Sequence, residues 1–257
     1  MARVKTMSSA FRTLLKGALN ASMIDMAVAA GRDMLANYNL LDNGEDAFYW
    51  WYHLPVRQLF NTYFKLTVHG EENVPVKGPI IFAPNHSSFL DPIVVSASAT
   101  FKQIHWIGKF EHFVEDPIVK SIFSMWSAIP IHRGKSDKGA MQKAIDILNC
   151  KADSGHCIGI FPEGTRTLDG KLGHLHNGAA KLAVTTGATI VPVGMKGMFG
   201  VLKKGEMFPK PTKVSVEFGK PVYTSHIKGQ QENWNLVTGI TAQVEAELRR
   251  MLGQENN

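Results

Sequence analysis

The sequence predicts an α/β fold in which a largely parallel central sheet is covered by helices and preceded by an N-terminal helical hairpin. From residue 66 onward, short apolar runs of strand length alternate with segments of helical periodicity. Before that point, apolar residues recur three and four positions apart, as one face of a helix requires. The 257 residues are enough to bury one sizeable core.

Residues 1–65 are predicted to be a helical segment at a membrane interface, separate from an α/β domain over residues 66–257. Basic residues gather near its start, and eight aromatic residues lie between positions 48 and 64. Aromatic and basic side chains suit an interfacial anchor on anionic lipid. The same rings suit a helical hairpin packed on the core, and both interpretations stay open.

The α/β domain is predicted from alternating segments. Strands are expected at Lys65–His69, Pro79–Ala83, Ile129–Ile131, Cys157–Phe161, Thr189–Val193 and Lys213–Phe218. Helices are expected at Pro92–Thr100, Pro117–Met125, Lys138–Leu148, Gly178–Thr186 and Asn235–Leu252. Strands joined by helices indicate parallel pairing.

Composition narrows the class of partner. Lys and Arg exceed Asp and Glu by 28 to 22, and the net charge of +6 fits a phosphorylated substrate or an anionic lipid surface. No nucleic-acid-binding motif accompanies the charge, so nucleic acid is not an expected partner. Cys150 and Cys157 lack partners at zinc-finger spacing and are expected to be reduced, as in a cytoplasmic protein. Neither a signal peptide nor a spanning apolar stretch is visible, which favours a membrane-surface location.

The segment IIFAPNHSSFLDP, residues 80–92, contains the first candidate site. An apolar strand is followed by a turn, and a helix is expected to begin near Ser87 or Ser88. His86 then lies at the strand-to-helix turn, where α/β proteins commonly hold ligands. With Asp91 folded back to fix its tautomer, the imidazole can accept the proton of an attacking hydroxyl.

The spacing of this pair is weak evidence by itself, because His132 and Asp137 repeat it. That second pair follows no strand-to-helix turn and lies in a polar loop. Context therefore selects His86 and Asp91 as the catalytic candidates.

The segment FPEGTRT, residues 161–167, is the second candidate site. Pro and Gly favour a rigid turn, Glu163 is acidic, and Arg166 can form two hydrogen bonds to a phosphate. Lys109 and Arg133 are further candidates for binding an anion. Together with the His–Asp pair, these residues predict a pocket that binds a phosphate and activates a nearby hydroxyl.

Four blocks occur in the order NHSSFLD, IPIHRG, FPEGTRT and IVPVG. Their combination resembles the phospholipid/glycerol acyltransferase superfamily, and looks most like its 1-acyl-sn-glycerol-3-phosphate acyltransferases. The resemblance implies that His86 is the general base and Asp91 its partner. It also implies acceptor-binding roles for Arg133, Glu163, Gly164, Thr165 and Arg166, with Lys109 as a further phosphate ligand.

The resemblance implies transfer of a fatty acyl group from acyl-CoA or acyl carrier protein to the free hydroxyl of a lysophospholipid. The implied acceptor is 1-acylglycerol 3-phosphate and the product phosphatidic acid. Neither a metal nor a bound cofactor is expected. The protein is expected to be peripheral or monotopic on the cytoplasmic face of a membrane. The alternatives are the same chemistry on glycerol 3-phosphate, another lysophospholipid or a lyso-aminolipid, hydrolysis of a lipid, and a non-catalytic lipid-binding adaptor.

Overall fold

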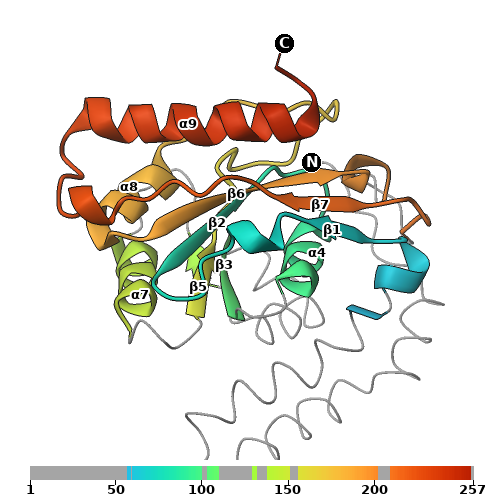
Figure 1. The fold of residues 1–257 in the computed structure, drawn as a ribbon, viewed down its shortest axis with the longest axis horizontal. Helices are drawn as coiled ribbons and strands as arrows, with labels where there is room; N and C mark the ends of the chain where they lie inside the picture. Colours follow the sequence, from blue (N-terminus) through green and yellow to red (C-terminus); the bar gives the residue numbers. More distant parts are fainter. Residues whose placement is uncertain are drawn as a thin grey trace, which may run out of the picture.

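The architecture is a seven-stranded sheet with helices on both faces (Figure 1). The structure is a computed structural model that describes residues 57–58, 60–99, 103–109, 129–131, 138–150, 156–201 and 209–255. The strands are β1 (Thr67–His69), β2 (Ile80–Pro84), β3 (Gln103–Lys109), β4 (Ile129–Ile131), β5 (His156–Gly159), β6 (Thr189–Lys196) and β7 (Ser215–Phe218). Their order in the sheet is β1-β7-β6-β2-β5-β3-β4.

All pairings in the sheet are parallel except that of β6 with β7. The largely parallel sheet expected from the sequence is therefore confirmed. The two central strands, β2 and β5, read IIFAP and HCIG, and their residues Ile80 to Pro84 and Cys157 to Gly159 are buried. Continuous burial is typical of parallel strands covered on both faces.

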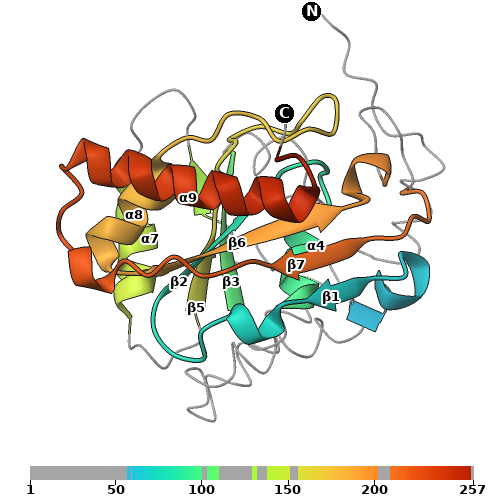
Figure 2. The same cartoon turned by 45° about the horizontal axis from the view of Figure 1, so that its top comes forward.

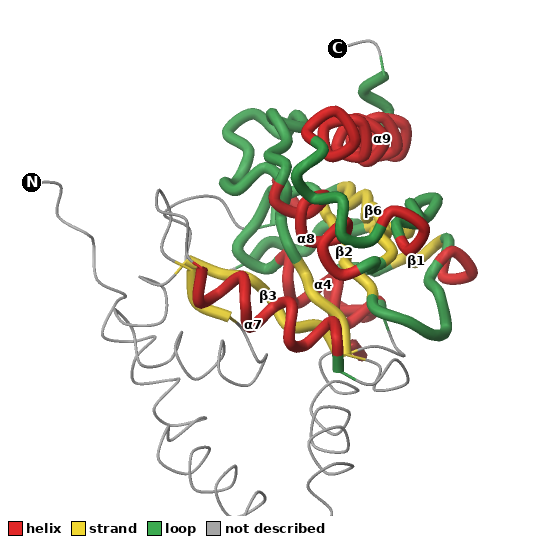
Figure 3. The backbone as a smooth tube through the Cα atoms, turned by 90° about the vertical axis from the view of Figure 1, so that its left-hand side faces the viewer, coloured by secondary structure: helices red, strands yellow, loops and turns green. Residues whose placement is uncertain are grey.

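The helices divide between the two faces. They are α4 (Asp91–Ser98), α7 (Lys138–Asn149), α8 (Gly178–Thr186) and α9 (Trp234–Leu252), with short 3-10 turns η1 (Glu71–Asn73), η2 (Met198–Gly200) and η3 (Ser225–Ile227). One hydrophobic cluster joins α4 to one face of the sheet, and a second joins α7, α8 and α9 to the other. Figure 2 shows α9, α8 and α7 as one layer, and Figure 3 shows α9 beside β6.

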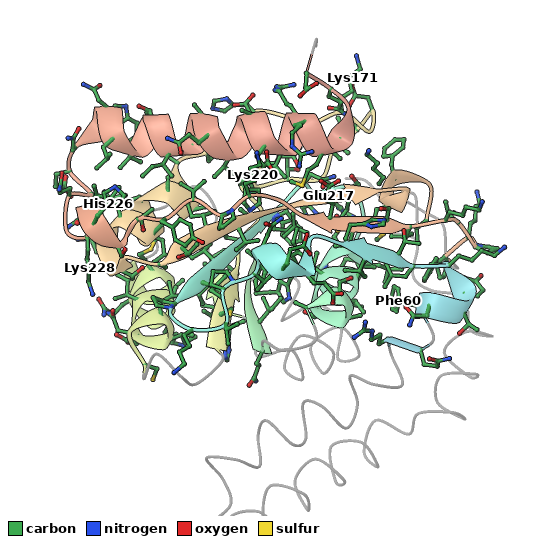
Figure 4. The ribbon with its side chains drawn as sticks, in the orientation of Figure 1. Phe60, Lys171, Glu217, Lys220, His226 and Lys228 are labelled. Carbon is green, nitrogen blue, oxygen red and sulfur yellow. The ribbon has the colours of Figure 1, made fainter. Side chains whose placement is uncertain are left out.

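Two residues that precede position 66 belong to the hydrophobic cluster that contains α4. Phe60 and Phe64 are buried there, with Phe60 placed at one edge of the domain in Figure 4. The rest of the predicted interfacial segment, residues 1–56 and 59, lies outside the described residues, as does the helix predicted at Pro117–Met125. The boundary near residue 66 stays a prediction. In the described ranges, every helix is too short or too polar to cross a membrane.

One strand is missing from the prediction, and one expected helix start is wrong. The sequence did not predict β3, although it pairs with both β5 and β4. The helix expected to begin near Ser87 or Ser88 begins at Asp91, because the carboxylate of Asp91 accepts hydrogen bonds from the N–H groups of both serines and holds them in a turn.

Candidate active site

The candidate site lies where β2 and β5 end. These strands are neighbours and parallel, so their carboxyl ends meet at one edge of the sheet, where α/β folds bind ligands. His86 follows β2 by two residues, and the FPEGTRT segment begins two residues after β5. The fold thus brings together the two segments that the sequence singled out separately.

Asn85 fixes the start of the turn that contains His86. Its Oδ1 accepts a hydrogen bond from the N–H of Met195 at 2.7 Å, and its Nδ2 donates to the carbonyl of the same residue at 3.2 Å. The side chain therefore continues the pairing of β2 with β6 beyond Pro84. Asn85 is only 5% exposed, so its two bonds to Met195 are shielded from water. They fix the point at which the turn leaves the strand.

His86 and Asp91 form the expected pair. His86 Nδ1 lies 2.8 Å from Asp91 Oδ2, and the side chains are 14% and 0% exposed. The same oxygen accepts from Ser87 N at 2.6 Å and Ser88 N at 2.8 Å. Burial raises the pKa of Asp91 above the ordinary carboxyl value, and the hydrogen bonds from His86, Ser88 and Ser87 act in the opposite direction.

This geometry selects one tautomer of the imidazole. An ionised carboxylate accepts only, so Nδ1 donates and the lone pair resides on Nε2. Within the described residues, Nε2 of His86 has no hydrogen-bond partner. The His86 side chain is 14% exposed, and its Nε2 lone pair can accept a proton as a general base does.

Glu163 ties the two segments together. Its Oε1 accepts from His86 N at 2.6 Å, its Oε2 accepts from Gly173 N at 2.8 Å, and its side chain is buried. Burial raises the pKa of Glu163, against the hydrogen bonds from Gly173 and His86. Two backbone bonds indicate that this carboxylate positions the loop that contains His86.

The remaining residues of the second segment form its turn. Gly164 has φ +64°, a left-handed conformation that favours glycine, and its N–H donates to the Phe161 carbonyl at 3.0 Å. Thr165 and Arg166 are exposed at the tip. The next residue, Thr167, donates its N–H to the His86 carbonyl at 2.8 Å, so the Arg166 backbone is held beside the imidazole segment.

The loop continues to the C-terminal end of α9. Leu172 N donates to Gln254 Oε1 at 2.9 Å, and Gln254 follows that helix. Figure 4 shows Lys171 beside the same helix end. The second segment is therefore held at His86 on one side and by α9 on the other.

The side chains of the other two expected anion ligands, Lys109 and Arg133, lie outside the described part of the chain. Lys109 is the last residue of β3, and the described structure gives its backbone only. Arg133 lies outside the described residues, as do His132 and Asp137. Their predicted positions near the pocket stay predictions.

Sequence reasoning missed three residues that shape the site. Phe161 and Thr167 contact the His86 segment through an aromatic ring and the main chain respectively, and Asn85 bonds the start of that segment to Met195 on β6. Asn85 directly precedes His86, and the other two begin and end FPEGTRT, so their place in the motifs was the available signal. Their partners lie on other segments of the chain and were not visible in the sequence.

Comparison with known proteins identifies the family. The model of the family described as Acyltransferase matches residues 65–196, which include both segments of the site. The chain belongs to the acyltransferase family. This confirms the resemblance drawn from the four blocks.

Individual relatives of this acyltransferase are similar over part of their length. It is 30% identical over 167 residues to the chloroplastic 1-acyl-sn-glycerol-3-phosphate acyltransferase LPAT1 of Arabidopsis thaliana, covering 63% of this chain and 45% of that protein. It is 33% identical over 131 residues to the 1-acyl-sn-glycerol-3-phosphate acyltransferase of Borreliella burgdorferi, covering 50% of each. The acyltransferase thus spans about half the length of these relatives.

A solved structure shares the fold. The crystal structure of the 1-acyl-sn-glycerophosphate (LPA) acyltransferase PlsC from Thermotoga maritima superposes with a TM-score of 0.62 at 22% identity, covering 92% of this chain and 91% of that one. At this identity the likeness concerns the fold alone. It agrees with the sheet and helix layers described above.

Proposed function

We propose that this acyltransferase transfers a fatty acyl group from an acyl thioester to the free hydroxyl of a lysophospholipid. The expected acceptor is 1-acylglycerol 3-phosphate and the product phosphatidic acid, in line with the names of the relatives. The observation that supports this best is the His86 imidazole, held through Nδ1 by Asp91 at 2.8 Å. A lysophospholipid hydroxyl needs such a base to attack a thioester.

In the proposed reaction, His86 Nε2 accepts the hydroxyl proton as the oxygen forms a bond to the thioester carbonyl carbon. The C–S bond then breaks, and the imidazolium returns the proton to the leaving thiolate. Asp91 stabilises the imidazolium between these steps. No acyl-enzyme forms and no metal is required for the proton balance.

We assign acceptor binding to the exposed turn after β5. Arg166 can form two hydrogen bonds to the acceptor phosphate, and the bond from Thr167 N to the His86 carbonyl keeps it near the base. Lys109 and Arg133 remain proposed as further phosphate ligands. Glu163, predicted from the sequence to bind substrate, is proposed to act through the backbone of His86 because both of its oxygens are occupied.

The N–H groups of Glu163 and Thr165, in the turn after β5, are our candidates for stabilising the oxyanion. The N–H groups of Ser87 and Ser88 bond to Asp91, and that of Gly164 bonds to Phe161. The three are therefore already engaged. Preorganised N–H donors stabilise the tetrahedral intermediate of acyl transfer without reorganisation.

We further propose that the enzyme acts on a membrane surface, on the cytoplasmic side, with acyl-CoA or acyl carrier protein as donor. Long-chain lysophospholipids reside in bilayers, and the ring-rich, basic segment before residue 66 has the composition of an interfacial anchor. The net charge of +6 favours anionic lipid.

Replacing the base tests the proposal. We expect H86A to lose at least about 10³-fold in kcat, because no other group takes the hydroxyl proton. The measurement is thiol release from acyl-CoA by full-length protein with lysophosphatidic acid in mixed micelles, with phosphatidic acid identified as product.

The matched control is H226A. His226 lies in η3, at the far end of the domain from Lys171 in Figure 4. The H226A variant should retain wild-type turnover. Robust phosphatidic acid formation by folded H86A would overturn the proposed mechanism, and free fatty acid as sole product would indicate a hydrolase.

A further inference from the structure

Three aromatic rings form a stack that ends on the His86 imidazole. The centroids of His86 and Phe161 are 3.9 Å apart with ring planes inclined by 21°. Those of Phe161 and Trp106 are 5.0 Å apart with planes inclined by 20°. Phe161 is therefore sandwiched between the imidazole and a fully buried indole.

The sheet register builds this stack. Trp106 on β3 lies opposite Gly159 on β5, and a Cβ at Gly159 would come within 2.5 Å of the indole ring. The missing side chain lets the indole lie flat across β5. Phe161 is two residues beyond Gly159, so it points to the same face and meets the indole.

The indole is fixed in turn by α4. Trp106 Nε1 donates to Ser96 Oγ at 3.0 Å, and both residues are buried. The indole therefore has a defined rotation as well as a defined depth. A fixed indole gives Phe161 a rigid support on the side away from His86.

We propose that Phe161 is a positioning residue for His86, and that its ring face, supported by Trp106, stabilises the imidazolium formed during acyl transfer. The inference rests on the proposed role of His86 as base. A cation close to an aromatic face is attracted by the ring quadrupole, more strongly where water is excluded. The imidazole is 14% exposed and lies well within the distance at which this attraction acts.

The stack and the carboxylate constrain the ring in different directions. Asp91 bonds to Nδ1 in the plane of the imidazole, whereas Phe161 contacts its face. The two contacts together set the direction in which Nε2 points. Of the described charged groups, Asp91 on α4 and Glu163 in the loop after β5 interact with His86 electrostatically.

The test is the pH dependence of kcat for full-length F161L, assayed by thiol release with lysophosphatidic acid in mixed micelles. Leucine keeps an apolar side chain and removes the π face. We expect kcat to fall about tenfold, with both KM values changed less than about twofold. The acidic limb of the kcat profile should move to lower pH, because the imidazolium loses stabilisation.

F161Y and F82L are the matched variants. F161Y retains the stacking ring and should restore kcat to within about threefold of wild type and the acidic limb to its original place. Phe82 is fully buried, whereas Phe161 is partly buried, and the Phe82 ring packs on Phe218 at a centroid distance of 5.8 Å. F82L should lower thermal stability and leave the limb unmoved.

Three results would overturn the inference: wild-type kcat in F161L, a lower kcat in F161L with an unmoved acidic limb, or F161Y behaving as F161L. Turnover by H86A would instead refute the proposed function. The two failures are therefore distinguishable.

Discussion

At the scale of single residues, Asp91 is unusual in how its two oxygens are used. Oδ2 receives hydrogen bonds from His86 Nδ1 and from the N–H groups of Ser87 and Ser88. Oδ1 is buried without a hydrogen-bond partner in the described structure. A buried carboxylate oxygen left unpaired is costly, and the burial that raises the pKa of this group reflects that cost.

This asymmetry predicts the behaviour of D91N. Asparagine can place its amide oxygen where Oδ2 lies and so keep all three hydrogen bonds. The bond from His86 Nδ1 then keeps the same tautomer of the imidazole. The variant should therefore lose mainly the negative charge that stabilises the imidazolium. We expect kcat to fall about 10- to 100-fold in the thiol-release assay.

D91A provides the comparison, since it leaves all three donors unpaired. It should be slower than D91N and less stable to urea. Equal activity of D91N and D91A would contradict this interpretation, because the hydrogen bonds to Oδ2 would then have no part in orienting the base.

The sequence was sufficient to predict the contact between His86 and Asp91, but not the contacts of their neighbours. Glu163 was assigned to acceptor binding because it lies in a block that resembles the acceptor-binding segment of the acyltransferase superfamily. Its bonds to His86 N and Gly173 N depend on where two distant segments meet. Backbone donors leave no trace in residue identity, so such a role is invisible before the fold is known.

At the scale of elements, the two loops that follow β2 and β5 behave as one unit. Glu163 accepts from His86 N, Thr167 N donates to His86 O, and His176 N donates to Pro162 O. The base and the turn with Arg166 are thus positioned by the same set of bonds. Disturbing one loop should displace the other.

E163Q tests this coupling. An amide cannot accept at both ends, so one of the two N–H groups will face an NH₂ group. We expect kcat/KM to fall about tenfold or more at pH 7. The control is E232Q, since the Glu232 side chain is 85% exposed and should be neutral. Wild-type kcat/KM in E163Q would show that the loops are held without this carboxylate.

The same variant has a signature in stability. A carboxyl whose pKa is raised by folding binds more protons in the folded state than in the unfolded state between the two pKa values. The contribution of Glu163 to the free energy of unfolding of the wild type should therefore decrease as pH rises from about 4 through the raised pKa of this carboxyl. Urea unfolding at a series of pH values should show a smaller decrease for E163Q.

Most elements were predictable because their patterns are local. β4, α8 and the C-terminal end of α9 have the predicted bounds, whereas β3 was missed. In β3, polar Gln103 and His105 interrupt the apolar residues, so neither a continuous run nor a clean alternation is visible. Burial of Trp106 depends on the missing side chain of Gly159 on the neighbouring strand, which no local window reveals.

At the scale of the whole molecule, close packing of α9 on β6 holds one helical layer to the sheet. A Cβ at Gly194 would lie 2.6 Å from the Cβ of Met251. The glycine of the fourth sequence block thus allows α9 to approach the sheet. The sequence predicted the α/β class but not the order of the strands in the sheet. That order depends on pairings between segments far apart in the sequence.

We expect G194A to lower the free energy of unfolding by about 1–3 kcal/mol through overpacking. M251G removes the Cβ that a side chain at position 194 would meet, so the double variant should lose less stability than the sum of the two single changes. Urea unfolding provides the measurement. G239A is the control: it lies on α9 with open space around its Cβ, and should stabilise by about 0.5–1 kcal/mol.

The side-chain bonds of Asn85 to Met195 have a consequence for the order of folding events. They join residues 110 positions apart, and the bond from His86 N to Glu163 joins residues 77 apart. Contacts of high sequence separation form late, because the intervening chain must first be closed into loops. We therefore expect a nascent or partly folded chain to lack a positioned His86, so that the proposed reaction begins only when the central strands have completed their assembly.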